Sequence, residues 1–322
     1  MSNNDGVTTK PNVSIIILNF NGGQHILNCI ESIYKTTKDF EIILIDNNST
    51  DNSENICKNK FPNIILIRNP INEGMSARNI GLKSANGKYI IFLDSDTIVT
   101  ENWVENFVGS FEEHGAGLYG PKFLKTGKEN EIDSAGNMIN IFGLAYARGK
   151  GESDVGRYDN FTKINYPAGA CVFSSNQVFQ EIGAVDKIFF AYHDDVDYGW
   201  RAALLEIPSY YEPKVTIYHL SSPTLKWSRR KFFLLERNRW ICLLSLYSTK
   251  TIIKLLPFLI LIEVGISSYF LINRIGLLKL EVFFSVLGML PEIRRRKKNI
   301  DLNRKVDDTI IAKNFTDDFI MP

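Results

Sequence analysis

Short apolar runs alternate with stretches of helical spacing along the first part of the chain. The apolar runs are rich in Ile, Val, Leu and Phe and are predicted as strands: Val13–Leu18, Glu41–Ile45, Asn63–Ile67 and Tyr89–Leu93. The stretches between them are predicted as helices: Gln24–Tyr34, Asp51–Lys60 and Met75–Ala85. Either Ser49 or Asp51 can cap the second helix. Apolar strands linked by single helices indicate an α/β fold with a mostly parallel, Rossmann-like sheet and helices on both faces.

Three groups of polar residues follow strands directly. They are Asn19 and Asn21 after the first strand, Asp46, Asn47 and Asn48 after the second, and Asp94 and Asp96 after the fourth. The carboxyl ends of strands are where open α/β sheets bind their ligands. These groups therefore predict a ligand site at one edge of the sheet.

The segment LDSDT carries the most informative of these groups. Asp94 and Asp96 are separated by one residue at the end of an apolar strand. Two such carboxylates form a compact oxygen site for a hard divalent cation, Mg²⁺ or Mn²⁺, of the kind that bridges a diphosphate. Sugar nucleotides are the expected ligands. Alternatively, the two acids cap the next helix, which is expected to start near Glu101.

A second acidic group lies in the segment FFAYHDDVDYGWRA and contains Asp194, Asp195 and Asp197. Crowded carboxylates repel one another, which raises their proton affinity toward neutral pH. That property suits a general base. A solvated acidic turn without chemistry is the other interpretation.

Composition narrows the class of protein. The chain has 322 residues, 44% of them apolar, and a formal net charge of +1, so a large core is expected and nucleic acid is not an expected partner. Its four cysteines are too few and too widely spaced for a zinc site or a disulfide framework, which fits a reduced compartment. The polar N-terminus shows no secretory signal.

The C-terminal part changes in character. The stretch Leu255–Ile272 is apolar except for Glu263 and is nearly long enough, as a helix, to span a bilayer. A second run, Ile275–Leu290, is shorter and carries two charges. Basic residues flank both runs, so both flanks are expected on the cytosolic side, with a two-pass hairpin or an in-plane anchor between them. A helical domain packed on the enzyme, or on a second copy as a homo-oligomer, is the alternative.

The order and spacing of four segments, VSIIILNFNG, IILIDNNSTDNS, NEGMSARNIGL and YIIFLDSDT, resemble the inverting glycosyltransferases of family 2, which have the GT-A fold. Farther along, YPAGACVF, the HDDVD segment and the ERNR sequence are similar to the rhamnosyltransferase-like branch. The resemblance covers about residues 12–240. It implies a GT-A domain at 12–225. Composition predicts a disordered N-terminus at 1–11, a helical membrane-associated region at 226–298 and a polar, weakly ordered tail at 299–322.

The resemblance also implies roles for individual residues. The metal ligands would be Asp94, Asp96 and His219. The donor and nucleotide would contact Asn19, Asn21, Asp46, Asn48, Arg78, Asp94 and Ser95. The base would be Asp195, with Asp194 as its acidic neighbour in place of the more usual Glu. The acceptor side would contain Gly169, Ala170, Asp197, Trp200 and Arg201.

Several of these roles have competing interpretations. Asp46 can accept the imide N–H of a pyrimidine or simply cap a helix. Arg78 either approaches the diphosphate or lies on an exposed helix surface. Asp197 and Arg201 can pair to orient their loop, and Trp200 forms an apolar wall for the sugar or packs in the core.

The sequence thus predicts a metal-dependent glycosyltransferase at the cytosolic face of the cell membrane. It would move a sugar from a UDP-, dTDP- or GDP-linked donor to a hydroxyl of a glycan acceptor, which membrane attachment suggests is lipid-linked. Three competitors remain: a processive polysaccharide synthase, whose QxxRW element Glu236–Trp240 resembles, a nucleotidyltransferase, and a non-catalytic membrane-bound binder of carbohydrate or nucleotide.

Overall fold

The computed structural model describes residues 12–220, 228–272 and 276–316. Its first part is a four-stranded parallel unit in the order β4–β1–β2–β3. The strands are β1 (Val13–Asn19), β2 (Phe40–Asp46), β3 (Ile65–Arg68) and β4 (Tyr89–Asp94). The connecting helices are α1 (Gly23–Thr36), α2 (Ser53–Lys60) and the 3₁₀ turn η1 (Gly74–Ala77), which continues as α3 (Arg78–Ser84). All four strands therefore end at the same edge of the sheet.

The second part extends the same sheet beyond β4 in the order β11–β6–β12–β10. Strand β11 runs antiparallel to β4, and β12 runs parallel to β6. The strands are β5 (Thr97–Val99), β6 (Leu118–Lys125), β7 (Lys128–Ser134), β10 (Thr162–Ile164), β11 (Cys171–Ser175) and β12 (Ser209–His219). A separate hairpin contains β8 (Asn137–Ile139) and β9 (Ala145–Ala147).

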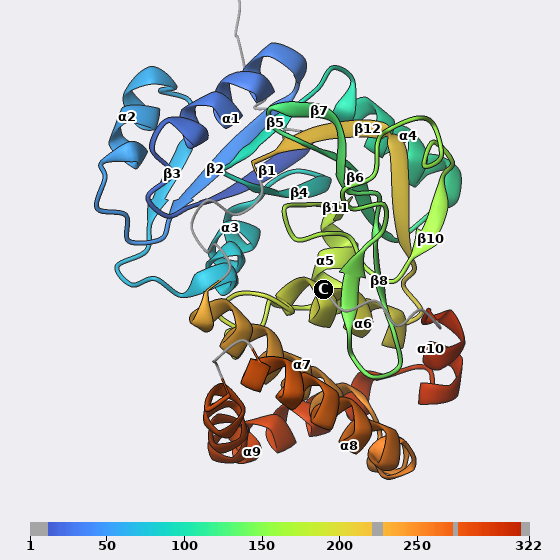
Figure 1. The fold of residues 1–322 in the computed structure, drawn as a ribbon. Coiled ribbons are helices and arrows are strands. Elements are labelled where there is room, and N and C mark those ends of the chain that lie inside the picture. Colours follow the sequence, from blue (N-terminus) through green and yellow to red (C-terminus); the bar gives the residue numbers. More distant parts are fainter. Residues whose placement is uncertain (1–11, 221–227, 273–275, 317–322) are drawn as a thin grey trace, which may run out of the picture.

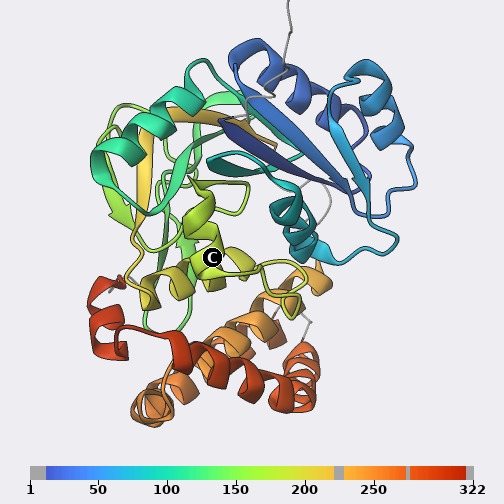
Figure 2. The ribbon, with the colours of Figure 1, turned by 180° about the vertical axis from the view of Figure 1, so that it is seen from behind.

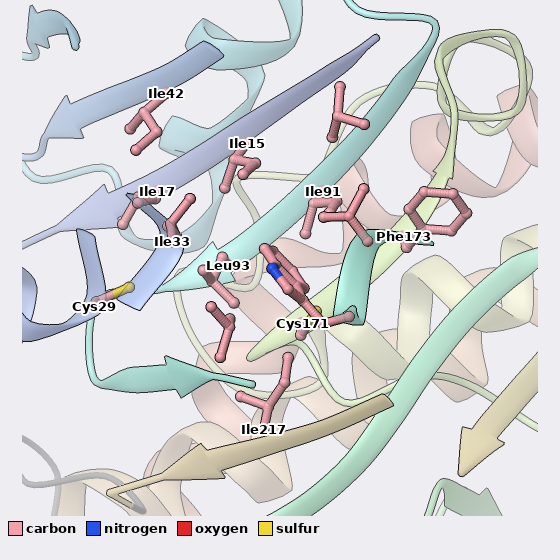
Figure 3. Packing of buried hydrophobic residues seen from close by; sticks show 14 of the residues in the cluster. Ile15, Ile17, Cys29, Ile33, Ile42, Ile91, Leu93, Cys171, Phe173 and Ile217 are labelled. Atoms are coloured by element: carbon pink, nitrogen blue, oxygen red, sulfur yellow. The ribbon is translucent and has the colours of Figure 1, made fainter. Parts of the chain in front are cut away.

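Apolar side chains of the sheet alternate between its two faces, and helices cover both. On one face Ile15 and Ile17 of β1 pack with Ile33 of α1, and Figure 3 shows this layer around Ile91 and Leu93 of β4. The helix α4 (Trp103–His114) belongs to the same face. On the other face lie α3, α5 (Asn176–Ile182) and α6 (Asp194–Leu204). The α/β fold with a mostly parallel sheet and helices on both faces is confirmed.

The C-terminal helices form a layer of their own beside α6 (Figures 1 and 2). They are α7 (Arg229–Leu246), α8 (Thr249–Ile272), α9 (Leu278–Asn303) and the short α10 (Asp308–Asn314). Their apolar residues pack with Val196 and Trp200 of α6 in one cluster. The expected helical region after the sheet domain is therefore present.

Three local expectations differ from the structure. The helix expected from Met75 begins as the 3₁₀ turn η1 before α3. The helix α2 starts after Asn52, although Asp51 still accepts a hydrogen bond from the Ser53 amide at 3.1 Å. The expected polar tail contains the end of α9 and helix α10, because Asp307 caps α10 and buried Ile311 anchors it.

One helix in the described part of the chain, α8, is long and apolar enough to cross a membrane by length and composition. Only 22% of its most apolar 18-residue stretch is buried inside the protein. Helices of soluble cores can pass the same test, so this is weak evidence on its own.

Candidate active site

A cavity of about 480 Å³ opens at the carboxyl ends of β1 and β4. Its lining also includes the residues before and at the start of α6 and one face of α7. Both acidic groups identified in the sequence reach it. Of the site residues expected from the sequence, those lining the cavity are Asn21, Asp94, Ser95, Asp96, Gly169, Ala170, Asp194, Asp195 and His219.

Asp94, Asp96 and His219 form the one cluster of potential metal ligands found in the described residues. Their ligand atoms all lie within 4.8 Å of one another. Asp94 ends β4, and His219 ends β12 next to Thr97 of β5, so sheet pairing brings residues 125 positions apart in sequence to one place. Two carboxylates and an imidazole suit Mn²⁺ or Mg²⁺ with remaining positions for phosphate oxygens or water.

The orientation of His219 is fixed by a further carboxylate. Its Nδ1 lies 2.8 Å from Oδ2 of Asp133 on β7, and its Nε2 lies 3.6 Å from Oδ1 of Asp96. Burial lowers the pKa of His219, but the hydrogen bonds to Asp133 and Asp96 outweigh it and raise the pKa to about 10. A cation bound at Nε2 would therefore release a proton from the imidazolium. Carboxylate–histidine pairs of this kind hold metal-binding imidazoles in place.

Arg78 lies behind the cation site and is buried. Its guanidinium pairs with Asp94, and its Nη2 donates to the Gly169 carbonyl at 2.9 Å. The amide of Gly169 in turn donates to Oδ2 of Asp195 at 3.1 Å. Arg78 does not line the cavity, and it joins the two acidic groups through these contacts.

Asp194 and Asp195 stand at the start of α6, with Asp195 only half-buried. Burial raises the pKa of Asp195, against hydrogen bonds from the Gly169 and Val196 amides. Burial and the charge of Asp195 raise the pKa of Asp194 to about 7. The pair thus has the proton affinity that a general base near neutral pH requires.

The polar group after β2 is held together away from the cavity. The side-chain amide of Asn19 donates to Asp46 at 3.1 Å and to Ser53 Oγ at 3.0 Å. Asn48 is exposed, and Asn21, which does line the cavity, accepts a hydrogen bond from the Thr50 amide at 2.7 Å. Of these residues only Asn21 lines the cavity, while Asp46 and Asn19 are buried outside its lining.

The structure does not bring three of the expected acceptor-side residues to the cavity. Trp200 is 2% exposed and packs edge-on against Tyr247 and Phe315. Asp197 is fully buried and pairs with Arg201 and with Arg296 of α9. Trp200 therefore packs in the core, which was one of its two predicted roles. Asp197 connects α6 to Arg296 of α9, and Arg201 connects α6 to the Ile182 carbonyl of α5.

Several cavity residues were missed from the sequence. Glu236 and Arg239 of α7 line the wall, and so does His193, whose pKa is lowered by burial to about 4. Glu236 and Arg239 belong to the ERNRW segment, which the sequence singled out, but nothing in that segment indicated that they would face this cavity. Nothing in the sequence pointed to Asp133.

A larger cavity of about 670 Å³ lies elsewhere, lined by residues of α3, α5, α6 and α9. Its lining mixes both signs of charge and includes none of the carboxylates at 94, 96, 194 and 195. The smaller cavity is therefore the candidate active site.

The fold is that of the GT-A glycosyltransferases. The chain superposes on the structure of GalNAc-T7 with UDP, GalNAc and Mn²⁺ with a TM-score of 0.59 and 17% identity, over 76% of this chain and 49% of that one. It superposes on Staphylococcus aureus TarS with a TM-score of 0.51 and 17% identity, over 73% of this chain and 40% of that one. At this identity the likeness concerns the fold alone.

Sequence comparison gives the family. The family described as "Glycosyl transferase family 2" matches residues 14–182, which is more than half of the chain. The chain belongs to this family.

Relatives match about a third of the chain. The minor teichoic acid biosynthesis protein GgaB of Bacillus subtilis is 44% identical over 108 residues, which are 31% of this chain and 12% of GgaB. The poly(ribitol-phosphate) beta-N-acetylglucosaminyltransferase TarP of Staphylococcus aureus is 32% identical over 131 residues, 38% of this chain and 40% of TarP. The chain thus spans well under half the length of these relatives.

Proposed function

We propose that the protein is a metal-dependent, inverting glycosyltransferase that moves a hexosyl or deoxyhexosyl unit from a nucleoside-diphosphate sugar to a hydroxyl group of a glycan. The observation that carries this proposal is the shared cavity. It contains a potential cation site at Asp94, Asp96 and His219 and a carboxylate of raised proton affinity at Asp195. These are the two chemical functions that a single displacement at an anomeric carbon requires.

Asp195 acts as the general base. Its carboxylate accepts the proton of the acceptor hydroxyl while the hydroxyl oxygen forms a bond to the anomeric carbon. The bond from that carbon to the diphosphate oxygen breaks at the same time, so the configuration inverts. Proton transfer by a positioned base contributes about 10²- to 10⁴-fold to the rate.

Asp94, Asp96 and His219 would hold the cation, which would supply positive charge to stabilise the leaving diphosphate. Asp133 holds the imidazole of His219 with Nε2 directed toward Asp96. Arg78 balances the charge of Asp94 from behind. The side chains of the site are therefore oriented by contacts within the protein.

The donor nucleotide is expected to enter the cavity past Asn21, with its base directed toward Asn48 and Asp46. We favour a uridine nucleotide, because GalNAc-T7 was solved with UDP and TarS with UDP-GlcNAc. A dTDP-linked deoxysugar, as in the rhamnosyltransferase-like branch, would use the same imide contact to Asp46.

The acceptor is proposed to be a lipid-linked or polymeric cell-surface glycan, which the protein meets at the cytosolic face of the membrane. Relatives named for teichoic acid and poly(ribitol-phosphate) synthesis support a polymeric acceptor. The outer faces of α8 and α9 support membrane contact, since they expose large apolar side chains including Ile260, Leu261, Phe283 and Phe284. Exposed basic residues provide charge for anionic headgroups: Arg229, Arg230, Arg294, Arg295 and Lys298.

A donor screen tests the proposal. Purified protein would be incubated with UDP-, dTDP- and GDP-sugars in Mn²⁺ or Mg²⁺, and release of the nucleoside diphosphate would be measured before and after EDTA. We expect one donor class to be consumed and EDTA to stop the reaction. The proposal is wrong if no donor is bound or consumed under any of these conditions.

A further inference from the structure

The segment that presents the proposed base has a strained backbone. Phe190, Tyr192 and His193 have positive φ angles of 63°, 64° and 58°. Residues other than glycine rarely adopt this left-handed conformation, and it persists where surrounding contacts hold it. The segment at 188–193 leads directly into Asp194 and Asp195, so its conformation decides where those carboxylates point.

Helix α7 provides one set of these contacts through Asn238, which is fully buried. The Nδ2 amide of Asn238 lies 3.0 Å from the carbonyl oxygen of Phe189, 2.9 Å from that of Ala191 and 2.7 Å from that of Tyr192. One side chain thus donates to carbonyls on both sides of the strained Phe190. Backbone carbonyls turned inward in this way would otherwise lack partners in the protein interior.

Arg237 completes the arrangement on the same helix. Its Nη2 donates to the carbonyls of Ile188 at 3.2 Å and Phe189 at 2.9 Å. Its Nε and Nη2 also donate to Oδ1 of Asn238, at 2.9 and 2.7 Å. The guanidinium therefore fixes which way the Asn238 amide points, with its N–H groups toward the segment.

The opposite side of the segment contacts the 3₁₀ turn η1. The Met75 amide donates to the Phe190 carbonyl at 2.8 Å. A Cβ atom at Gly74 would lie only 1.9 Å from that carbonyl oxygen, and Gly74 itself has a φ of +62°. Only glycine allows this approach, so the segment is held between η1 and α7.

Helix α7 is itself anchored by four buried or half-buried charges. Arg239 pairs with Glu236 on α7 and with Glu263 on α8, while Lys279 on α9 pairs with both glutamates. Burial disfavours the Glu236 carboxylate, but Arg239 and Lys279 outweigh it and lower its pKa to about 2. The C-terminal helices therefore fix the position of α7 relative to the cavity.

We propose that Asn238 and Arg237 are positioning residues for the reaction. They hold the strained segment at 188–193, through which α7 sets the direction of the Asp195 carboxylate toward the acceptor hydroxyl. This inference rests on the proposed role of Asp195 as the base. It gives the C-terminal helices a part in the chemistry through Asn238 and Arg237, neither of which lines the cavity.

The test is Asn238→Ala in the full-length protein. We expect kcat to fall by about 100-fold, the loss typical of a misplaced reacting group, while the donor KM changes by less than about threefold. The donor KM is spared because no contact of Asn238 involves the cation site. An unchanged kcat, with kcat/KM lowered only by a rise in the donor KM, would overturn the proposal.

Ser174→Ala is the matched control. Ser174 is fully buried in β11 and donates from Oγ to the Gly117 carbonyl at 2.6 Å, so its loss also removes a buried hydrogen bond. We expect a similar fall in the thermal midpoint and an unchanged kcat. Equal losses of kcat in both variants would mean that general destabilisation explains the effect, and the positioning role would be rejected.

Hydrogen exchange gives a readout that needs no enzymatic activity. The amides of Met75 and Ala191 donate within this contact region. They should exchange about tenfold faster in Asn238→Ala than in the wild type or in Ser174→Ala, because the segment opens more readily. Unchanged exchange would overturn the positioning role, whereas faster exchange in a protein that transfers no sugar would refute only the proposed function.

If Asn238→Ala does not fold, Arg237 provides the second test. Arg237→Ala should lower kcat about tenfold, and Arg237→Lys should recover part of it by keeping one donor near the carbonyls. Wild-type kcat and exchange in Arg237→Ala would reject the proposal.

Discussion

The helices that cover the sheet and the helices that follow it distribute their polarity in opposite ways. Helix α1 turns Ile26, Ile30 and Ile33 toward the sheet and keeps its polar residues outside. Helix α8 turns Glu263 inward to Arg239 and Lys279, while Leu261 and Val264 are exposed. An apolar outer face combined with charges paired inside is unusual for a helix surrounded by water.

This difference indicates that the two regions have different roles. The sheet region builds a core from its own apolar residues and places polar groups at strand ends, where ligands bind. The C-terminal helices hold one another through the charges of Arg239, Glu263 and Lys279 and leave an apolar surface outside. We infer that the first region carries the chemistry and that the second region places it at an apolar boundary.

The strongest test of this division is Asp195→Asn. The amide cannot accept the hydroxyl proton, so kcat should fall by about 10²- to 10⁴-fold while the affinity for the donor nucleotide is retained. Initial rates and isothermal titration with the nucleotide would measure the two quantities. Glu129→Gln, on an exposed residue of β7, is the control and should keep wild-type kinetics. Retained turnover in Asp195→Asn would place the base elsewhere.

The apolar boundary is tested by the double substitution Phe283→Ser and Phe284→Ser on α9. Both rings are more than half exposed, so the folded protein loses little internal packing. Transfer of an aromatic ring from water into the bilayer stabilises the bound state by about 1.5–3 kcal/mol. Binding to vesicles with anionic lipid should therefore weaken by about 30-fold or more. Co-sedimentation would measure the binding. Val155→Ser, which is 80% exposed and lies outside these helices, should bind like the wild type. Equal binding by all three proteins would contradict the membrane assignment.

The cation site of the sheet region is tested through Asp133→Asn. Loss of the carboxylate partner removes the constraint on the His219 ring, which typically costs about 10- to 100-fold in metal affinity. Electron paramagnetic resonance of free Mn²⁺ would give the dissociation constant without any substrate. An unchanged constant would show that His219 does not ligate the metal.

The pH dependence gives the smallest effect. The base Asp195 must be deprotonated to accept a proton, and burial raises the pKa of its carboxyl above the ordinary value. The rate should therefore begin to fall at a higher pH than an ordinary aspartate would give, and reach a slope of about tenfold per pH unit on the acid side. Rates across pH 5 to 9 would show this limb, which should disappear in the residual activity of Asp195→Asn. A flat profile down to pH 5 would mean that this pair does not titrate in the rate-limiting step.

The sheet region was largely predictable because its signals are local. Each strand is a continuous apolar run, and the polar residues that follow Leu18, Ile45 and Leu93 mark the ligand edge directly. The placement of Asp94 beside His219 needed only the resemblance to the family. Sheet pairing then supplied the geometry.

The acceptor side was less predictable because it depends on contacts between distant segments. Trp200 and Asp197 follow the proposed base closely in sequence, but the turn of α6 directs them to Tyr247 and Arg296, which come 47 and 99 residues later. No local pattern states which helix will cover α6. Asp133 was not predicted for the same reason: it contacts His219 because β6 pairs with both β7 and β12, which the sequence does not show.

All four cysteines of the chain are buried: Cys29, Cys57, Cys171 and Cys242. Burial also raises the pKa of the thiols, to about 12 for Cys29 and about 11 for Cys57, so they react slowly with maleimides in the native protein. A single cysteine introduced at an exposed position such as Leu261 could therefore carry a fluorescent or spin label without removing any natural thiol. The protein is thus already suited to measuring the depth of each helix in a lipid bilayer, one labelled position at a time.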